Sequence, residues 1–401
     1  MHLFVELRFP EFKEKINFDL FKNHFDLISG YAFKSDYFNE DGIDLIIPKN
    51  FSKNGYGNFN ENINKKTLEN VDEKFTATKD DLLILLTDLT PSCELLGNPL
   101  YIKDDKLHYV NQRISKVVIT NNLDKNYLKY ILLTRRYKTH IIETATGTTV
   151  RHSSNKAVLN YKFFIPTLQE QTKIADFLGA VDKQLDILNQ KKEKLNLYKK
   201  GVMQQLFSQQ IRFKDDNGND FPDWEEKTLG EVARINSGSS PTNILSKEGK
   251  IPYFKVEQLN NCKKYQINTE YFIDSSIKII TKGSIIFPKR GASILLNKVR
   301  ILKVDGFMDT NMMSLTFNKD YNEFMYYLLV YKNLSKIADT TSIPQINNKH
   351  IEPYKITIPL IEEQTKIANF LSAIDNQIEA VENQITKTET YKKGLLQQMF
   401  V

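Results

Sequence analysis

The chain has 401 residues, of which 41% are apolar and 26% are charged, and its formal net charge is +6. This length predicts two or three domains, and 25 Phe with 19 Tyr are ample for more than one core. No apolar run approaches the ~18 residues that cross a bilayer, and Met1–Val5 lacks a basic start and a cleavage site, so we expect a cytoplasmic protein without membrane contact. Cys93 and Cys262 stand alone, which excludes a disulfide framework and a thiolate metal site.

Residues 1–164 predict a mixed α/β domain. Strand-like runs bounded by Gly, Pro, Asn and Asp lie at 44–47, 82–86 and 116–119. A helix is expected over 127–139, and a short closing strand at Tyr161–Lys162 ends the domain.

Residues 165–210 predict a long helix. Pro166 bars an earlier start, and Thr167 with Glu170 predicts a capping box. A helix of about 40 residues would be about 60 Å long, and it cannot bury an apolar seam alone. Spacings of four and three place such a seam on one side, formed by Ile174, Leu178, Val181, Leu185, Leu188, Leu195 and Val202.

Residues 211–357 predict a second mixed domain, and residues 358–401 a second long helix. Strands are expected at 253–256, 284–287 and 298–304, a helix at 321–338, and a closing strand at Tyr354–Lys355. The second helix lacks the capping Thr, with Leu360 in its place. Its seam repeats the first, with Ile367, Leu371, Ile374, Ile378, Val381, Ile385 and Leu395.

The chain repeats itself at an offset of 193 residues. Residues 165–207 and 358–400 align without a gap and are identical at 21 of 43 positions. We therefore predict an α+β fold with a pseudo-twofold internal repeat, in which two mixed α/β domains are joined and followed by two long helices packed as an antiparallel coiled coil. Lys192 and Thr388 interrupt the seam. The alternative is two independent helices, each lying on its own domain.

The repeated motif resembles the specificity (S) subunit of type I restriction-modification systems. It consists of a variable domain ending in Ile-Pro, then Glu-Gln-x-x-Ile-Ala-x-Phe-Leu, a long helix and Tyr-Lys-Lys-Gly, all present twice. Asp223-Trp224, Gly30-Tyr31-Ala32-Phe33 and Asn111-Gln112-Arg113 add to the resemblance, whereas Phe18-Asp19 stand where the pattern favours a Trp.

The resemblance implies that 1–164 and 211–357 are target recognition domains, each reading one half of a bipartite, asymmetric site in double-stranded DNA. The helices at 165–210 and 358–401 would set the spacer and dock two modification (methyltransferase) subunits. The chain itself would have no catalysis and no cofactor, because S-adenosylmethionine, ATP and Mg would be carried by the modification and restriction subunits.

Candidate DNA-binding residues come from basic and amide clusters in or beside predicted loops. Arg and Lys pair with guanine edges and Asn and Gln with adenine edges, although a mild basic excess is equally typical of an ordinary solvated surface. The set is Asn111, Gln112, Arg113, Arg151, His152, Lys289, Arg290, Asn311, Gln345 and Asn347, and Arg135-Arg136 form a further cluster.

Candidate partner-binding residues come from the helix ends, which repeat more faithfully than a seam requires. They are Tyr198, Gln204, Gln205, Phe207, Tyr391, Gln397, Gln398 and Phe400.

Two other classes stay open. An enzyme with a cryptic site would show turnover, yet the Walker, His-Glu-x-x-His and Gly-x-Ser-x-Gly motifs are absent, and Gly55-Tyr56-Gly57 and Glu352-Pro353-Tyr354 match cofactor motifs only in part. The six His show no metal-ligand spacing. A coiled-coil scaffold would bind without sequence preference and would not explain two different domains.

Overall fold

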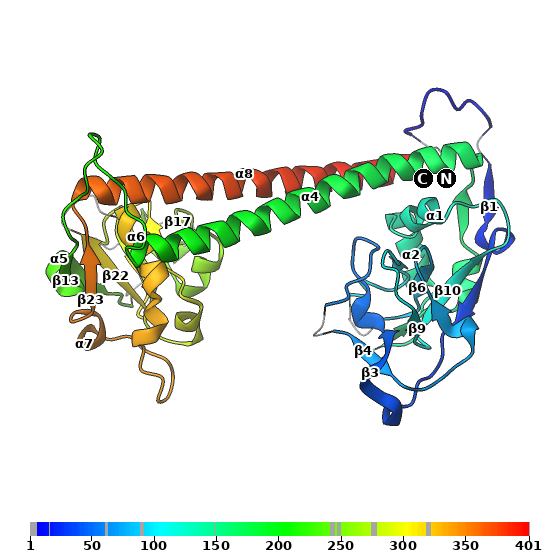
Figure 1. Cartoon of the computed structure of the whole chain (residues 1–401), viewed down its shortest axis with the longest axis horizontal. Coiled ribbons are helices and arrows are strands. Elements are labelled where there is room, and N and C mark those ends of the chain that lie inside the picture. Colours follow the sequence, from blue (N-terminus) through cyan, green and yellow to red (C-terminus); the bar gives the residue numbers. More distant parts are fainter. Residues whose placement is uncertain are drawn as a thin grey trace. The chain divides into compact units, whose positions relative to one another are not determined.

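The computed structural model describes residues 6–15, 17–60, 63–88, 92–148, 150–240, 250–273, 279–317 and 322–400, with the backbone of 245–246. The chain divides into two compact units: unit 1 is Met1–Asn189 with Asn383–Val401, and unit 2 is Gln190–Glu382. Each unit therefore joins one mixed domain to part of each long helix (Figure 1). The predicted boundaries at 164, 210 and 357 divide sequence segments, and the compact units cut across them.

The two predicted long helices are α4 (Leu168–Phe207) and α8 (Ile361–Met399). In unit 2, Lys192 Nζ lies 3.0 Å from Glu382 Oε1, and Lys199 Nζ lies 2.6 Å from Asp375 Oδ1. Seven residues forward along α4 thus correspond to seven residues back along α8, so the helices pair antiparallel, as predicted. Lys192, which interrupts the apolar seam, is used for an ion pair between the helices.

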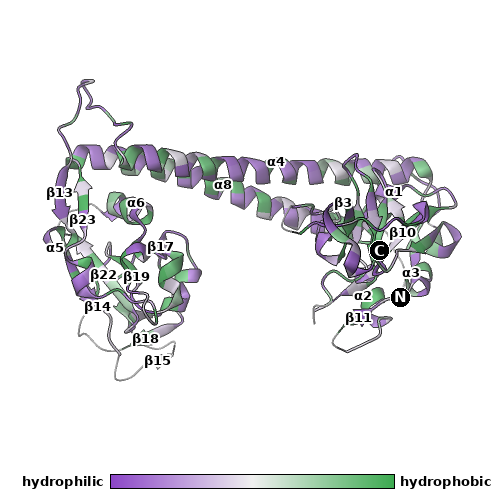
Figure 2. Ribbon diagram, turned by 60° about the horizontal axis from the view of Figure 1, so that its bottom comes forward, coloured by the Kyte–Doolittle hydropathy of each residue, from purple (hydrophilic) through white to green (hydrophobic). Residues whose placement is uncertain are grey.

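The ends of each seam also face a domain. In unit 1, Ile174, Leu178 and Val181 of α4 share a core cluster with Leu395 of α8 and the first domain. In unit 2, the cluster contains Ile367 and Leu371 of α8, Val202 of α4 and the second domain. The helices are therefore paired, and each also lies on a domain as the alternative proposed. Figure 2 shows the long helices mostly in hydrophilic colours, with apolar positions recurring along them.

The start of α4 differs from the predicted capping box. Thr167 Oγ1 accepts the Glu170 backbone N–H at 3.4 Å, but the Glu170 carboxylate binds Arg8 at 2.6 and 2.7 Å instead of the cap backbone. A bidentate Arg–carboxylate pair is stronger than a neutral amide bond, which accounts for the difference. Glu363 at the start of α8 binds Arg212 at 3.1 and 2.7 Å in the same way.

These two arginines come from equivalent segments at the ends of the helices. The backbone N–H groups of Glu6 and Leu7 both donate to the Gln398 carbonyl at 3.0 Å. Ile211 N–H donates to the Gln205 carbonyl at 3.3 Å, and Gln205 is the repeat equivalent of Gln398. The segment before the first domain is thus hydrogen-bonded to the end of α8. In the same way, the segment before the second domain is hydrogen-bonded to the end of α4.

The domain of unit 1 contains two four-stranded sheets. The first is antiparallel, in the order β2 (Phe25–Ser29), β10 (Ile114–Ile119), β6 (Leu82–Leu85), β8 (Pro99–Tyr101). The second has the order β4 (Lys65–Thr67), β3 (Phe38–Ile46), β9 (His108–Val110), β5 (Thr76–Ala77), with β3 and β9 parallel. Two short pairs are β1 (Phe18–Leu20) with β12 (Lys162–Phe164) and β7 (Thr87–Asp88) with β11 (Arg151–His152).

The domain of unit 2 repeats this plan. A five-stranded sheet has the order β14 (Ala233–Ser237), β22 (Met312–Phe317), β19 (Ile285–Pro288), β20 (Arg300–Leu302), β17 (Tyr265–Gln266). A four-stranded sheet has the order β15 (Leu245–Ser246), β18 (Tyr271–Ile273), β16 (Ile251–Phe254), β21 (Phe307–Met308), with β16 and β21 parallel. β13 (Glu225–Thr228) pairs with β23 (Lys355–Ile358). All predicted strands overlap strands of these sheets.

The central strands β6 and β19 are buried on both faces, which explains their continuous apolar sequences. In β6, Leu82 and Ile84 belong to the core cluster that also contains Tyr127 and Leu128, whereas Leu83 and Leu85 belong to the cluster of the second sheet. In β19, Ile285 and Ile286 divide between two clusters in the same way.

The predicted domain helices are each interrupted. The one expected at 127–139 is two helices, because the Thr134 hydroxyl accepts the Tyr137 N–H at 3.3 Å and starts a new helix. The one expected at 321–338 ends early, because Asn333 adopts a φ of 59°; Tyr321 lies outside the described residues. The helices are α1 (Lys125–Ile131), α2 (Arg135–Glu143), α3 (Asn155–Leu159), α5 (Leu229–Val232), α6 (Asn322–Lys332) and α7 (Asn348–Ile351).

Short 3-10 helices complete the two domains. They are η1 (Phe21–Asn23), η2 (Ser35–Tyr37), η3 (Pro48–Asn50), η4 (Glu73–Phe75), η5 (Val256–Asn260), η6 (Ala292–Leu296) and η7 (Leu334–Ile337). In the part of the chain that the structure describes, no helix combines the length and apolarity needed to cross a bilayer.

One buried and one half-buried lysine in unit 1 predict a pH-dependent stability. Burial lowers the pKa of Lys129 and of Lys138 to about 7 from the ordinary 10.5. Between these values the unfolded chain binds more protons than the folded chain, so stability should rise with pH by about 1.4 kcal/mol per pH unit for each lysine. Below about pH 7 both states are protonated and this slope vanishes. Urea unfolding at several pH values between 7 and about 9 should show this rise in the free energy of unfolding. The double variant Lys129→Met with Lys138→Met should lose the rise. An equal slope in the wild-type protein and the double variant would contradict the assignment to these lysines.

Candidate nucleic-acid interface

Three segments meet at the end of β19 in unit 2. Lys289 N–H donates to the Asn311 carbonyl at 2.7 Å, and the Lys289 carbonyl accepts Ile346 N–H at 2.8 Å. Arg290 forms an isolated bridge with Gln345. The structure thus brings together five predicted residues that are separated in the sequence. We call this place junction 2, formed by residues 289–291, 309–311 and 339–347.

Unit 1 builds an equivalent junction at the end of β6. Leu86 N–H donates to the Arg113 carbonyl at 2.9 Å, and the Leu86 carbonyl accepts Ser153 N–H at 2.9 Å. The following strand β7 pairs with β11, which carries Arg151 and His152. Junction 1 is therefore formed by residues 86–88, 111–113, 146–148 and 150–153, and it contains the other five predicted residues.

The two junctions share a closed loop. Thr146 and His152 exchange backbone hydrogen bonds of 2.9 Å in both directions, and Asp339 and Gln345 do the same at 2.9 Å. Both pairs are related by the 193-residue offset of the repeat. In Figure 1 the second loop, which precedes α7, projects from unit 2 on the side away from α8.

The turns at 111–113 and 309–311 are also shaped alike. The Asn111 side-chain oxygen accepts the Arg113 N–H at 3.2 Å, and the Asp309 carboxylate accepts the Asn311 N–H at 2.7 Å. Asn111 therefore uses its acceptor to hold the turn, whereas Arg113 and Asn311 are exposed. Such Asx turns fix the direction of the following side chain.

The charges of junction 2 are partly buried. Burial raises the pKa of Asp309, and two backbone hydrogen bonds act against this rise. Burial also lowers the pKa of half-buried Lys289, while the Asp309 charge acts in the opposite direction. Arg290 lies next to Lys289 and is exposed. Of the Lys289, Arg290 and Asp309 side chains, it is therefore the one that reaches solvent without burial of its charge.

A family model of the type I restriction modification DNA specificity domain matches twice, at residues 18–197 and 222–389. The chain belongs to this family. Each match includes one junction, so the two junctions lie in two copies of a DNA specificity domain.

Named relatives agree with the family assignment. The type I restriction enzyme MjaVIII specificity subunit of Methanocaldococcus jannaschii is 27% identical over 295 residues, covering 68% of this chain and 69% of the relative. The EcoR124I/EcoR124II specificity subunit of Escherichia coli is 25% identical over 222 residues, covering 51% of each chain. The chain is a type I restriction-modification specificity subunit.

A solved structure agrees with the fold. The crystal structure of the S subunit of a type I restriction-modification system from M. genitalium has a TM-score of 0.60 at 18% identity, covering 100% of this chain and 99% of that one. At this identity the likeness concerns the fold, and it confirms the predicted α+β architecture with paired long helices.

Sequence reasoning missed an aliphatic residue in each specificity-domain loop. Ile343 is 56% exposed beside Pro344, and Val150, its equivalent at the 193-residue offset, is half-buried beside Arg151. The repeat alignment contains this signal, because it places both residues two positions before the end of the loop. An aliphatic side chain here suits contact with a thymine methyl group.

The predicted partner-binding residues divide into two groups. Tyr198 and Tyr391 are 53% and 54% exposed, and Gln204, Gln205, Gln397 and Gln398 are exposed as well. Phe207 and Phe400 are only 6% exposed, because their rings pack 5.2 Å from Tyr331 and 5.3 Å from Tyr127. These two phenylalanines therefore pack in the cores of this structure, and their role as partner contacts stays a prediction.

Two further expectations concern Arg135-Arg136 and metals. The two arginines line a surface pocket with Gln397 and Phe400, so they lie at the end of α8 and outside junction 1.

Within the described ranges, no group of three or more His, Cys, Asp and Glu side chains is arranged to hold a metal ion.

Proposed function

We propose that junctions 1 and 2 read the two halves of one bipartite, asymmetric DNA target. The observation that carries this proposal is that one backbone arrangement is built twice and furnished with different side chains. Junction 1 presents Arg113, Arg151 and His152, whereas junction 2 presents Arg290 and Asn311. Equivalent backbones should approach DNA alike, and different side chains should select different bases.

The helices α4 and α8 would set the distance between the half-sites. Each runs from one unit into the other, and the separation of the two readers would define an unread spacer. The helix ends would dock two modification subunits, which carry S-adenosylmethionine and methylate adenine. Restriction subunits with ATP and Mg would complete the complex, while this chain supplies recognition alone.

The test is to express the chain with its modification subunits and sequence methylated adenines. We expect one motif with two different half-sites at a fixed spacing. A continuous or symmetric motif, or modification without sequence preference, would contradict the proposal. Methyl transfer or DNA cleavage by the isolated chain would instead support the enzymatic alternative.

Arg290→Ala should weaken binding to the target duplex by about 1 to 3 kcal/mol and relax one base position in one half-site. Lys289→Ala should weaken all sequences alike and reduce the slope of log affinity against log salt by about 1, because a lysine on phosphate releases one counterion. Arg151→Ala is the matched control, since it should relax only the other half-site. Methylation maps and salt titrations measure both effects; variants with unchanged motifs and affinities would remove these residues from the interface.

The exposed helix ends predict two partner positions per chain. Native mass spectrometry of the complex should show two modification subunits bound to one specificity subunit. Tyr391→Ala and Tyr198→Ala should each weaken one of the two positions by about 1 to 3 kcal/mol, as expected for an exposed aromatic anchor at an interface. A wild-type ratio of one partner per chain, or full double occupancy in the double variant, would be evidence against this surface.

A further inference from the structure

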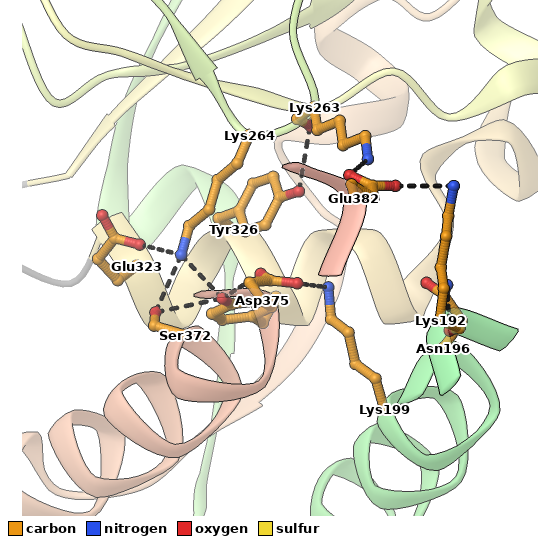
Figure 3. A network of polar contacts seen from close by, with 11 residues as sticks. Lys192, Asn196, Lys199, Lys263, Lys264, Glu323, Tyr326, Ser372, Asp375 and Glu382 are labelled. Atoms are coloured by element: carbon orange, nitrogen blue, oxygen red, sulfur yellow. Dashed lines mark hydrogen bonds and ion pairs between the residues drawn. The ribbon is translucent and has the colours of Figure 1, made fainter. Parts of the chain in front are cut away.

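Each specificity domain is tied to the helix pair by a polar network, which is buried at Asp182 in unit 1 and partly buried at Asp375 in unit 2. In unit 2, Asp375 of α8 accepts a hydrogen bond from Lys199 of α4 at 2.6 Å (Figure 3). It accepts another from the Tyr327 hydroxyl of α6 at 2.6 Å. Lys264 of the domain donates to the Tyr327 hydroxyl at 2.8 Å and to Ser372 at 3.0 Å. One carboxylate thus joins three helices, and we call this network joint 2.

Unit 1 contains the equivalent network, joint 1. Asp182 of α4 lies 2.5 Å from Lys392 of α8 and accepts the Tyr130 hydroxyl of α1 at 2.8 Å. A domain lysine is again present, since Lys129 lies 3.7 Å from Asp182 and donates to Tyr56 at 2.5 Å. Asp182 and Asp375 are repeat equivalents, as are Lys392 and Lys199.

The domain lysines of the two joints come from different places. Lys129 belongs to α1, whereas Lys264 precedes β17. The aspartate and the lysine on the helices are the same in both copies, whereas the position of Ser372 is Gly179 in joint 1. Each domain supplies one tyrosine that binds the aspartate and one lysine from a different segment, and Lys264 also pairs with Glu323 at 2.6 Å. Retention of this chemistry in two otherwise diverged domains indicates that the joint does more than fill space.

We propose that the joints fix the angle at which each specificity domain is held on the helix pair, so that Asp182 and Asp375 are positioning residues for spacer-length discrimination. This inference rests on the proposed function. Apolar side chains such as Leu178 and Leu371 make up the core clusters around the joints, and apolar burial is non-directional. Hydrogen bonds to charged groups are directional, and those of the buried Asp182 and the half-buried Asp375 are costly to leave unmade, so they select one angle.

A small rotation about a joint is enough to misread a spacer. A domain of this size is about 30 Å across, and the loop of junction 2 projects on the side away from α8. At about 30 Å from the joint, a rotation of about 6° moves a reading loop by about 3.4 Å, the rise of one base pair. A looser joint should therefore admit neighbouring spacers without changing which bases are read.

The experiment uses the full chain with its modification subunits and the isosteric variants Asp182→Asn and Asp375→Asn. Binding is measured on duplexes that carry the wild-type motif with its native spacer or a spacer one base pair longer or shorter. We expect both half-site sequences to be kept and the preference for the native spacer to fall by about tenfold or more. Unchanged discrimination in both folded variants would overturn the proposal.

Three further variants separate positioning from stability. Tyr130→Phe and Tyr327→Phe each remove one hydroxyl and should lower discrimination in the same direction if an Asn variant does not fold. Leu328→Ala, next to Tyr327 in the core, destabilises unit 2 without altering a polar contact and should leave spacer preference unchanged. Equal loss of discrimination in Leu328→Ala would overturn a specific role of the joint. If the wild-type complex itself recognises no bipartite motif, the proposed function fails, which is a separate outcome.

Discussion

Replacing Arg8 by alanine is expected to destabilise unit 1 by about 3 to 5 kcal/mol, because it leaves a buried carboxylate without its partner. Glu170 is fully buried, and Arg8 binds it through two nitrogens at 2.6 and 2.7 Å. Arg212→Ala is the matched variant in unit 2, where Glu363 is equally buried. Its effect should be smaller, because Trp224 Nε1 still donates to Glu363 at 3.2 Å. The first domain has Phe18-Asp19 where the family pattern favours a Trp. Glu170 therefore lacks the second hydrogen-bond donor that Trp224 supplies to Glu363.

Urea unfolding combined with hydrogen exchange of each unit measures these losses. Adding Glu170→Gln to Arg8→Ala removes the unpaired charge and should recover part of the stability. If Arg8→Ala and Arg212→Ala each lowered the free energy of unfolding by less than about 1 kcal/mol, these pairs would behave like surface ion pairs.

Much of the fold was predictable because it follows from periodicity. The apolar seam, the 193-residue repeat and the continuous apolar strands each express a single local pattern, and the structure contains all of them. The breaks at Thr134 and Asn333 were missed, because one hydroxyl bond and one left-handed residue outweigh a helical pattern. The burial of Phe207 and Phe400 was not foreseen, because repetition does not distinguish a core residue from a docking residue.

The candidate interface was predictable only residue by residue. Basic and amide side chains in loops pointed to each position, but their assembly depends on non-local backbone bonds such as those of Leu86 and Lys289. These two residues make the corresponding backbone bonds in their own junctions, but they lie 203 residues apart in the sequence. The 193-residue offset of the repeat therefore does not align them. The joints were invisible in the sequence for the same reason, since Lys129 and Lys264 come from unrelated segments.

The second large effect concerns the spacer. One heptad inserted after Asn189 and one after Glu382 fall at the boundaries of the compact units, so they interrupt neither the Lys192–Glu382 pair nor the contacts within a unit. Seven residues in each helix preserve the seam and lengthen the pair by about 10 Å. This length corresponds to about three base pairs of rise.

The preferred spacer should therefore lengthen by about one to three base pairs, while the bases recognised in both half-sites stay the same. Each added base pair also turns the second half-site by about 34° around the duplex, a turn that the helix pair does not match. The DNA must absorb this difference in twist, so affinity should fall even at the best spacer, by an amount set by the stiffness of the spacer sequence. Maps of methylated adenines for the two-heptad variant measure the new spacing. An unchanged spacer at full activity would mean that the separation of the two readers is not determined by α4 and α8.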